Sequence, residues 1–425
     1  MSTEVYVTTQ TGHAPPRQEG LPVKLALLLA SGLTILAGAI VSPALPDMEG
    51  HFASVANADF LVRLVLTLPS LVIALTAPLV GMVADRWGRK PVLLAALVLY
   101  GLAGSSGFVL DSLYGILAGR ALLGVAVAGI MTSVTALIAD YYAGEARAAF
   151  MGLQAAFIGF GGVVILTGGG VLAEIGWRAP FAVYLIALAI VPLAFRALYD
   201  PPRIDTSDTT AAQATDSAVP VRMIGFIYLI MLFIQSVFYL IPTQLPFYVR
   251  NDLDTDNTTL VGIAMATGTG VAALSSLASR RLRGWMVQRS GMAEIRTGGY
   301  LQVLGLAFAL MSASFAGIAL AQSYAWLLPA MVLNGLGFGL VIPTMNIWLT
   351  AVAPARLRGR AVGGLSSAMF VGHFLSPVIS EPLSDAVGLD TTYGIAGMAL
   401  IAVAAGLLLA QRLFPREEVP ALVRA

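Results

Sequence analysis

Cysteine is absent from this chain of 425 residues, and charged side chains make up only 11% of it. Without cysteine there can be no disulfide, no thiolate zinc site and no thiol nucleophile. The three histidines lie far apart in the sequence, so a multi-histidine metal site is not expected either. A net charge of +1 gives no indication of a nucleic-acid partner. We therefore predict a protein with no metal, no cofactor and no bound nucleic acid.

Apolar residues take the place of the missing charge: 58% of the chain is hydrophobic and the mean hydropathy is +0.84. Soluble domains carry about 25% charged residues. Apolar runs of about 20 residues, enough to cross ~30 Å of hydrocarbon, recur along the whole length. The sequence therefore predicts an all-α membrane protein. Its first apolar run, from about Leu25 to Leu45, is too long for a cleaved signal peptide.

Breaks marked by charge, proline or glycine divide the chain into twelve candidate spanning helices. They cover residues 23–46, 60–83, 91–110, 113–139, 147–173, 179–199, 222–249, 259–280, 297–319, 325–351, 360–384 and 392–413. A polar segment typical of a flexible linker separates the sixth helix from the seventh. We predict an N-terminal six-helix bundle at 1–199 with a polar tail at 1–22, a cytoplasmic linker at 200–221, and a C-terminal six-helix bundle at 222–425.

Arginine and lysine are distributed unevenly between the two sides of these helices. Twenty of them fall on the side that holds both termini, and only Arg63, Arg178 and Arg250 fall on the other. Because cytoplasmic loops carry the excess of basic residues, we expect both termini in the cytoplasm.

The two halves also resemble each other. A shift of 211 residues places "GEARAAFMG" (144–152) on "ARLRGRAVG" (355–363), so that Arg147 matches Arg358. Two parallel six-helix repeats are one arrangement found in secondary transporters, which bind substrate at the repeat interface near the middle of the membrane.

A compact group of charged residues and glycines interrupts the apolar pattern at "GMVADRWGRKPVL" (81–93), in the loop between the second and third helices. This pattern resembles the loop 2–3 signature of the major facilitator superfamily in the residues Gly81, Asp85, Arg86, Gly88, Arg89 and Lys90. With twelve helices and a 6+6 repeat, the resemblance covers nearly the whole chain. It implies two pseudo-symmetric six-helix bundles around a central cavity.

The resemblance also implies a latch on the cytoplasmic side. Asp85 would cap the helix that begins at Arg358 and Arg360, while Asp140 would pair with Arg89. Such a latch would hold the outward-open state and would break when the cytoplasmic side opens.

Arg120 falls inside the predicted helix at 113–139, about seven residues from its outer end. An arginine inside the membrane is costly and usually faces a cavity or a partner. The segment "RALLG" (120–124) resembles the helix-4 motif of proton-coupled facilitators, although Leu123 replaces the usual Gln. This resemblance implies that Arg120 influences proton transfer; the alternative is an arginine that extends to the membrane surface.

Three other residues are candidates for carrying the proton. Asp47 lies at the outer end of the first helix, where it could meet Arg120 or could be a solvated loop acid. His373 lies near mid-membrane, where a side chain with a pKa near neutrality could relay a proton or simply pack. Glu381, near the outer end of the eleventh helix, is the third candidate.

Polar side chains that could line a central cavity are few and scattered. By the family resemblance we expect substrate contacts from Gln235, Tyr239, Gln244, Asn334, Asn346 and Trp348. No cluster of arginine or lysine indicates a phosphate or dicarboxylate pocket. The pattern therefore favours an uncharged, cationic or zwitterionic amphiphile.

Together these features predict proton-coupled export of small amphiphilic compounds, as in the drug-exporting branch of the superfamily. The fifth helix differs from that branch, since Ile165 and Leu166 stand where Gly-Pro is expected. An importer or facilitated carrier of a nutrient or metabolite is the alternative, and a non-transporting receptor or scaffold is a second. No nucleophile–base pair or metal cluster suggests an enzyme. We expect a monomer in the cytoplasmic membrane of a bacterium, with lipid, protons and a small molecule as partners.

Overall fold

The computed structural model describes residues 20–200, 220–289 and 299–413. Most of the predicted tail at 1–22 and of the predicted linker at 200–221 therefore lies outside the described residues. Within the described parts, the regular elements are helices, and twelve helical stretches are long and apolar enough to cross a membrane. The twelve-helix, all-α prediction is confirmed.

The first half of the chain forms six of these stretches, some of them interrupted. The helices are α1 (Leu21–Ala39), α2 (Leu45–His51), α3 (Ala58–Trp87), α4 (Arg89–Gly104), α5 (Ser106–Val109), α6 (Leu113–Tyr141), α7 (Gly144–Ile175), α8 (Ala179–Ala182) and α9 (Ile186–Ala197). α1 with α2, α4 with α5, and α8 with α9 each make up one span.

The second half repeats the arrangement. Its helices are α10 (Val221–Phe238), α11 (Leu240–Asn251), α12 (Thr258–Arg289), α13 (Tyr300–Ala319), α14 (Tyr324–Val352), α15 (Arg358–Val387) and α16 (Leu389–Leu413). α10 and α11 together make up one span.

The first span of each half is broken, whereas the sequence predicts one continuous helix at 23–46 and another at 222–249. A short 3₁₀ turn at Ser42–Ala44 separates α1 from α2, and Tyr239 separates α10 from α11. Proline lies within the first break, at Pro43, and shortly after the second, at Pro242, and a proline nitrogen cannot donate the backbone hydrogen bond that continues a helix.

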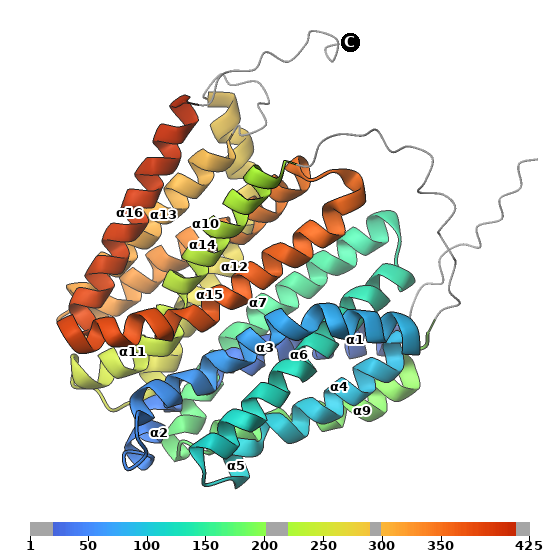
Figure 1. Ribbon diagram of the computed structural model, residues 1–425, viewed down its shortest axis with the longest axis horizontal. Coiled ribbons are helices and arrows are strands. Elements are labelled where there is room, and N and C mark those ends of the chain that lie inside the picture. The colour runs from blue at the N-terminus through green and yellow to red at the C-terminus, as the bar shows by residue number, and fades with distance from the viewer. Residues whose placement is uncertain (1–19, 201–219, 290–298, 414–425) are drawn as a thin grey trace, which may run out of the picture.

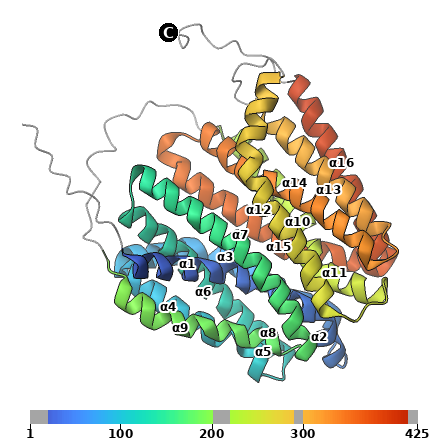
Figure 2. The same ribbon diagram turned by 180° about the vertical axis from the view of Figure 1, so that it is seen from behind.

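Two apolar cores hold the helices together. One joins buried side chains of α1 to α9, and the other joins those of α10 to α16. Among the described buried residues, Phe247 of α11 packs in the first core and Leu166 of α7 in the second. Figures 1 and 2 show the helices as two bundles that meet near α2 and α11 and spread apart toward the starts of α1 and α10. We refer to the first region as the α2/α11 end of the molecule.

Two helix pairs connect the bundles. α3 packs along α15, and α7 packs along α12. The second contact depends on glycine: a Cβ added to Gly170 would lie 2.6 Å from the Thr258 carbonyl oxygen, and one added to Gly262 would lie 2.5 Å from the Leu166 carbonyl oxygen. At this point the backbones of α7 and α12 touch without side chains between them.

Candidate functional site

A cavity of about 280 Å³ lies between the two bundles and is called the central cavity below. Its volume is close to the lower limit of the roughly 300–1,000 Å³ range that is typical of small-molecule sites. Among the described residues that line it, none is Asp, Glu, Lys or Arg. Lining residues come from α1, α3 and α7 of the first bundle and from α10, α11, α12, α14 and α15 of the second.

Aromatic rings form one part of the cavity wall. The rings of Phe238 and Phe338 are stacked, with centroids 3.6 Å apart and planes inclined by 5°. Tyr239 and His373 are also stacked, at 4.0 Å and 16°, and Phe370 lies edge-on to His373. These five residues, the aromatic wall, combine side chains from α10, α14, α15 and the break at Tyr239.

Asn334 is the polar side chain that stands out in the cavity. It is 2% exposed, and its Nδ2 has no hydrogen-bond partner among the described residues. The hydroxyls of two other lining residues already donate within their own helices, Thr34 to the Ser31 carbonyl at 2.7 Å and Thr269 to the Met265 carbonyl at 3.0 Å. A buried donor without a partner is unusual in folded proteins.

A buried ion pair connects the bundles at the α2/α11 end. Nε of Arg63 on α3 lies 2.6 Å from Oε2 of Glu381 on α15, and it donates a 3.0 Å hydrogen bond to Oε1 of Gln244 on α11. Gln244 in turn donates from Nε2 to Oε2 of Glu381 at 2.8 Å. The three residues, called the Arg63 cluster, are between 0% and 5% exposed. Removing one partner of such a buried pair typically costs about 3–5 kcal/mol.

Further contacts fix the guanidinium of Arg63. Its Nη1 donates to Oε2 of Glu49 at 2.9 Å and to the carbonyl of Asp59 at 2.8 Å. Its Cζ lies 3.8 Å from the centre of the Phe247 ring. The arginine is therefore held by groups from both bundles, and its orientation is set before any substrate binds.

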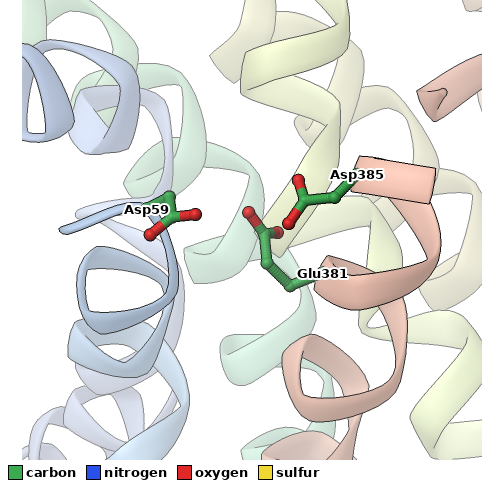
Figure 3. Close-up of side chains that lie close together, drawn as sticks. All are labelled: Asp59, Glu381 and Asp385. Atoms are coloured by element: carbon green, nitrogen blue, oxygen red, sulfur yellow. The ribbon is translucent and has the colours of Figure 1, made fainter. Parts of the chain in front are cut away.

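Three carboxylates gather beside this arginine. Oxygens of Asp59, Glu381 and Asp385 all lie within 4.8 Å of one another. Figure 3 shows Asp59 on one side and Glu381 with Asp385 on the other, with their carboxylates turned toward each other. Negative charges this close repel each other, so the three carboxylates depend on the positive charge of Arg63.

A second ion pair joins the bundles nearby. Asp47 on α2 lies 2.7 Å from Nη1 of Arg250 on α11, and Arg250 also contacts Asp256 at 3.0 Å. Ser42 adds a hydrogen bond to the carbonyl of Pro242. Of the two alternatives for Asp47, the structure shows neither a contact with Arg120 nor a free loop acid, because Asp47 pairs with Arg250 across the bundle interface.

Arg120 is fully buried inside the first bundle. It donates to the carbonyls of Val65 at 2.7 Å and Ala37 at 2.6 Å, and to the hydroxyl of Tyr184 at 2.8 Å. The alternative that it reaches the membrane surface is wrong, since its exposure is 0%. No acid forms an ion pair with it in the parts of the chain that the structure describes.

The predicted latch is only partly assembled. Arg89 and Asp140 form an ion pair. Asp85 is exposed and has no ion pair among the described residues, and Arg358 and Arg360 at the start of α15 are exposed as well. The expected contact of Asp85 with that helix is thus absent, because the bundles diverge at the end opposite to α2 and α11 (Figure 1).

The remaining residues of the motif lie at or near the turn between α3 and α4. Gly88 has φ +107°, a conformation that side chains disfavour. Gly81 would accommodate a Cβ, with Thr132 3.5 Å away. Arg86 is exposed, whereas the backbone N–H groups of Arg89 and Lys90 both donate to Oδ1 of Asp200 at 2.9 Å.

The expected substrate contacts separate into two groups. Tyr239 and Asn334 line the central cavity, as does the proton candidate His373. Four others do not line it: Gln235 packs against α15 at Gly372, Gln244 belongs to the Arg63 cluster, Asn346 donates to the Ile342 carbonyl at 3.0 Å, and Trp348 is buried against Tyr300 and Phe226. One sequence does not reveal which face of a helix is turned inward.

Two residues of this site were missed from sequence. Arg63 was counted with the outer loops, although it falls inside the predicted helix at 60–83, and a charge inside a predicted span was the available signal. Asp200 was assigned to the linker, and no local pattern indicates that it meets the start of α4.

Comparisons with known proteins agree with this architecture. The family model described as Major Facilitator Superfamily matches residues 27–377 and 284–424. The bacillibactin exporter of Bacillus subtilis (strain 168) is 25% identical over 367 residues, covering 82% of this chain and 86% of that protein. The class D tetracycline resistance protein of Salmonella ordonez is 24% identical over 414 residues, covering 94% and 98%.

Solved structures show the same fold. A bacterial homologue of the human lysosomal transporter Spinster, in an inward-facing and occupied conformation, superposes with a TM-score of 0.75 at 19% identity, covering 94% of this chain and 98% of that one. A D-xylose–proton symporter gives 0.71 at 18% identity, covering 91% and 96%. With the family model matching most of its length, the chain belongs to the Major Facilitator Superfamily and is a multi-pass membrane transporter rather than an enzyme.

Proposed function

We propose that the protein exports small amphiphilic compounds from the cell by alternating access, in exchange for protons. The observation that carries this proposal is the buried Arg63–Glu381 ion pair, a titratable contact between the two bundles. It adjoins the central cavity through α11, because Ile241 and Pro242 line the cavity and Gln244, two residues further on, belongs to the Arg63 cluster.

The proposed orientation follows from the basic residues. The excess of twenty basic residues over three supports an orientation in which the α2/α11 end lies outside the cell. In this orientation the described conformation is closed to the outside by the Arg63 cluster and by Asp47–Arg250. The unpaired Asp85 is consistent with a cytoplasmic latch that is open.

The proposed coupling step is a change of partner at Glu381. When Glu381 is ionised, it pairs with Arg63 and the outer side stays closed. When that side opens, the pair separates and the Glu381 carboxylate is exposed to external protons. Closing again brings the guanidinium against the protonated carboxyl and favours release of the proton. His373 lies eight residues earlier on α15, ~12 Å along the helix, and lines the cavity, so it can receive the proton on its way to the cytoplasm.

Export is favoured over import by the named relatives. The bacillibactin exporter and the tetracycline resistance protein both match more than four fifths of the chain. At identities of 24–25%, these relatives support export as the direction of transport. The cavity itself is the evidence for the kind of substrate.

The test uses everted membrane vesicles from a host that lacks its own pumps. Respiration acidifies the vesicle interior, and acridine orange fluorescence reports whether an added compound from a panel of amphiphiles releases protons. We expect several compounds to release protons with the unaltered protein. We expect Glu381→Gln to reduce this response about tenfold or more, since coupling of ligand and proton is typically worth 5–150-fold.

The matched controls are Glu381→Asp, which keeps the acid, and Glu145→Gln, which makes the same change at an exposed position. Both should retain a response within a few-fold of the unaltered protein. Compounds that move in the same direction as protons would instead establish an importer. A Glu381→Gln variant with full proton release would remove Glu381 from the coupling step.

A further inference from the structure

The central cavity carries a chemical signature beyond its size. It joins an aromatic wall, a buried amide donor without a partner, and the absence of any charged side chain among its described lining residues. Each of these features restricts what can bind there.

The aromatic wall favours a flat ring. Phe238 and Phe338 stack nearly parallel, and so do Tyr239 and His373, and all four rings line the cavity. Aromatic rings prefer offset-stacked or edge-to-face contacts with other rings, and such contacts add to the gain from burying apolar surface.

Asn334 favours a hydrogen-bond acceptor on that ring compound. Asn334, on α14, lines the cavity and is only 2% exposed. Its Nδ2 has no hydrogen-bond partner among the described residues. A buried donor that lacks a partner is unfavourable, and a carbonyl oxygen from a ligand would remove this deficit.

The lining disfavours charge on the ligand. A cation enclosed in an apolar site without a carboxylate would lose its hydration and gain no ion pair. An anion would be equally unfavourable while His373 is neutral. Glu381, the buried acid nearby on α15, already has Arg63 and Gln244 as partners.

We propose that the central cavity binds an uncharged compound with a flat aromatic ring and one hydrogen-bond acceptor, which takes the Nδ2 hydrogen of Asn334. The inference rests on the proposed function in one respect, that the central cavity is the substrate site. It narrows the cargo from amphiphiles in general to neutral ring compounds, and it excludes cationic and zwitterionic ones.

Binding to the purified full-length protein, with no membrane gradient, tests the inference with three probes of one shape. Xanthone is flat, neutral and carries a central carbonyl; xanthene has a methylene group in its place; N-methylacridinium is flat and cationic. By equilibrium binding we expect xanthone to bind about tenfold more tightly than xanthene, as one hydrogen bond allows, and N-methylacridinium to bind more weakly than either.

Variants assign the preference to one amide. Asn334→Leu should reduce the ratio of xanthone to xanthene affinity to about one. Asn346→Leu, on the same helix but bonded to the Ile342 carbonyl and outside the cavity, should keep the tenfold ratio.

Three results would overturn the inference: no binding of xanthone, equal or tighter binding of N-methylacridinium, or an undiminished ratio in Asn334→Leu. The ranking of the probes on the unaltered protein stands even if that variant does not fold. Since no proton gradient is present, loss of proton coupling would defeat the proposed function and leave this ranking intact.

Discussion

Arg120 directs all of its described hydrogen bonds to groups within its own bundle. Its partners come from three other spans: Ala37 on α1, Val65 on α3 and Tyr184 beside α9. Carbonyl oxygens and a hydroxyl satisfy the fork of the guanidinium without an acid. The geometry thus favours a structural role, in which one side chain ties four spans together, over the role in proton transfer that the motif implies.

Replacing Arg120 by Met should therefore lower stability without altering proton coupling. Hydrogen bonds to charged groups contribute about 1.5–3 kcal/mol each, so losing three should lower the free energy of unfolding by about 3 kcal/mol or more. Thermal unfolding in detergent measures this change, with the exposed Arg147→Met as the control. Unchanged stability combined with loss of substrate-induced proton release would instead make Arg120 a coupling residue.

Residue type was easier to predict than residue environment. The sequence identified Tyr239, Asn334 and His373, which do line the central cavity, because polar groups in apolar helices are rare. The same argument selected Gln235 and Trp348, which face other helices. Rotation about a helix axis depends on packing between distant segments, which one sequence does not contain.

Among the elements, α7 and α12 make the closest contact between the bundles. Their backbones touch at Gly170 and Gly262, and the Thr258 hydroxyl donates to the Gly170 carbonyl at 2.8 Å. Small residues at helix crossings allow this approach within a membrane. The contact needs glycine on both helices.

Gly170→Val should separate the two helices and destabilise the closed α2/α11 end. Overpacking of a tight contact typically costs about 1–3 kcal/mol. Gly168→Val is the matched control, because no atom lies within 4 Å of a Cβ at that position on the same helix. Thermal unfolding of both variants should show a loss only for Gly170→Val; equal losses would indicate that helix propensity, and not the contact, is responsible.

Helix number and order followed from apolar length alone, while helix continuity did not. The breaks at Ser42–Ala44 and at Tyr239 interrupt spans whose apolar character continues on both sides of the break. A proline inside a membrane helix can produce a kink or a full break, and neighbouring helices decide between them. The two broken regions also meet, since the Ser42 hydroxyl donates to the Pro242 carbonyl.

At the scale of the whole molecule, the two ends are in opposite states. Ion pairs and glycine contacts join the bundles at the α2/α11 end, while Asp85 at the other end is exposed. The Asp85 contact of the predicted latch would form only when the molecule adopts the opposite conformation, whereas Arg89 and Asp140 are already paired. The same sequence adopts both conformations. The sequence could therefore predict which residues form the latch, but not whether the latch is closed in a given conformation.

Asp85→Asn should shift the balance further toward the described conformation. An exposed ion pair contributes about 0.2–1 kcal/mol, so the ratio of the two conformations should change by up to about fivefold. The chain has no native cysteine, so spin labels on Leu153→Cys and Leu409→Cys, both exposed, report the separation of the bundles. The distance distribution should lose its shorter component in Asp85→Asn and keep it in Asp254→Asn; identical distributions would argue against the latch.

The depth of the Arg63–Glu381 pair has a consequence for how the transporter responds to dissolved salt. Ions screen charges that are in contact with water over about 8 Å at physiological ionic strength, and they screen buried pairs much less. The Arg63 and Glu381 side chains are only 6% and 5% exposed, whereas those of Arg250 and Asp47 are 36% and 34% exposed. A rise in salt at the α2/α11 end should therefore weaken the Asp47–Arg250 pair more than the Arg63–Glu381 pair, so the two bundles should stay joined there.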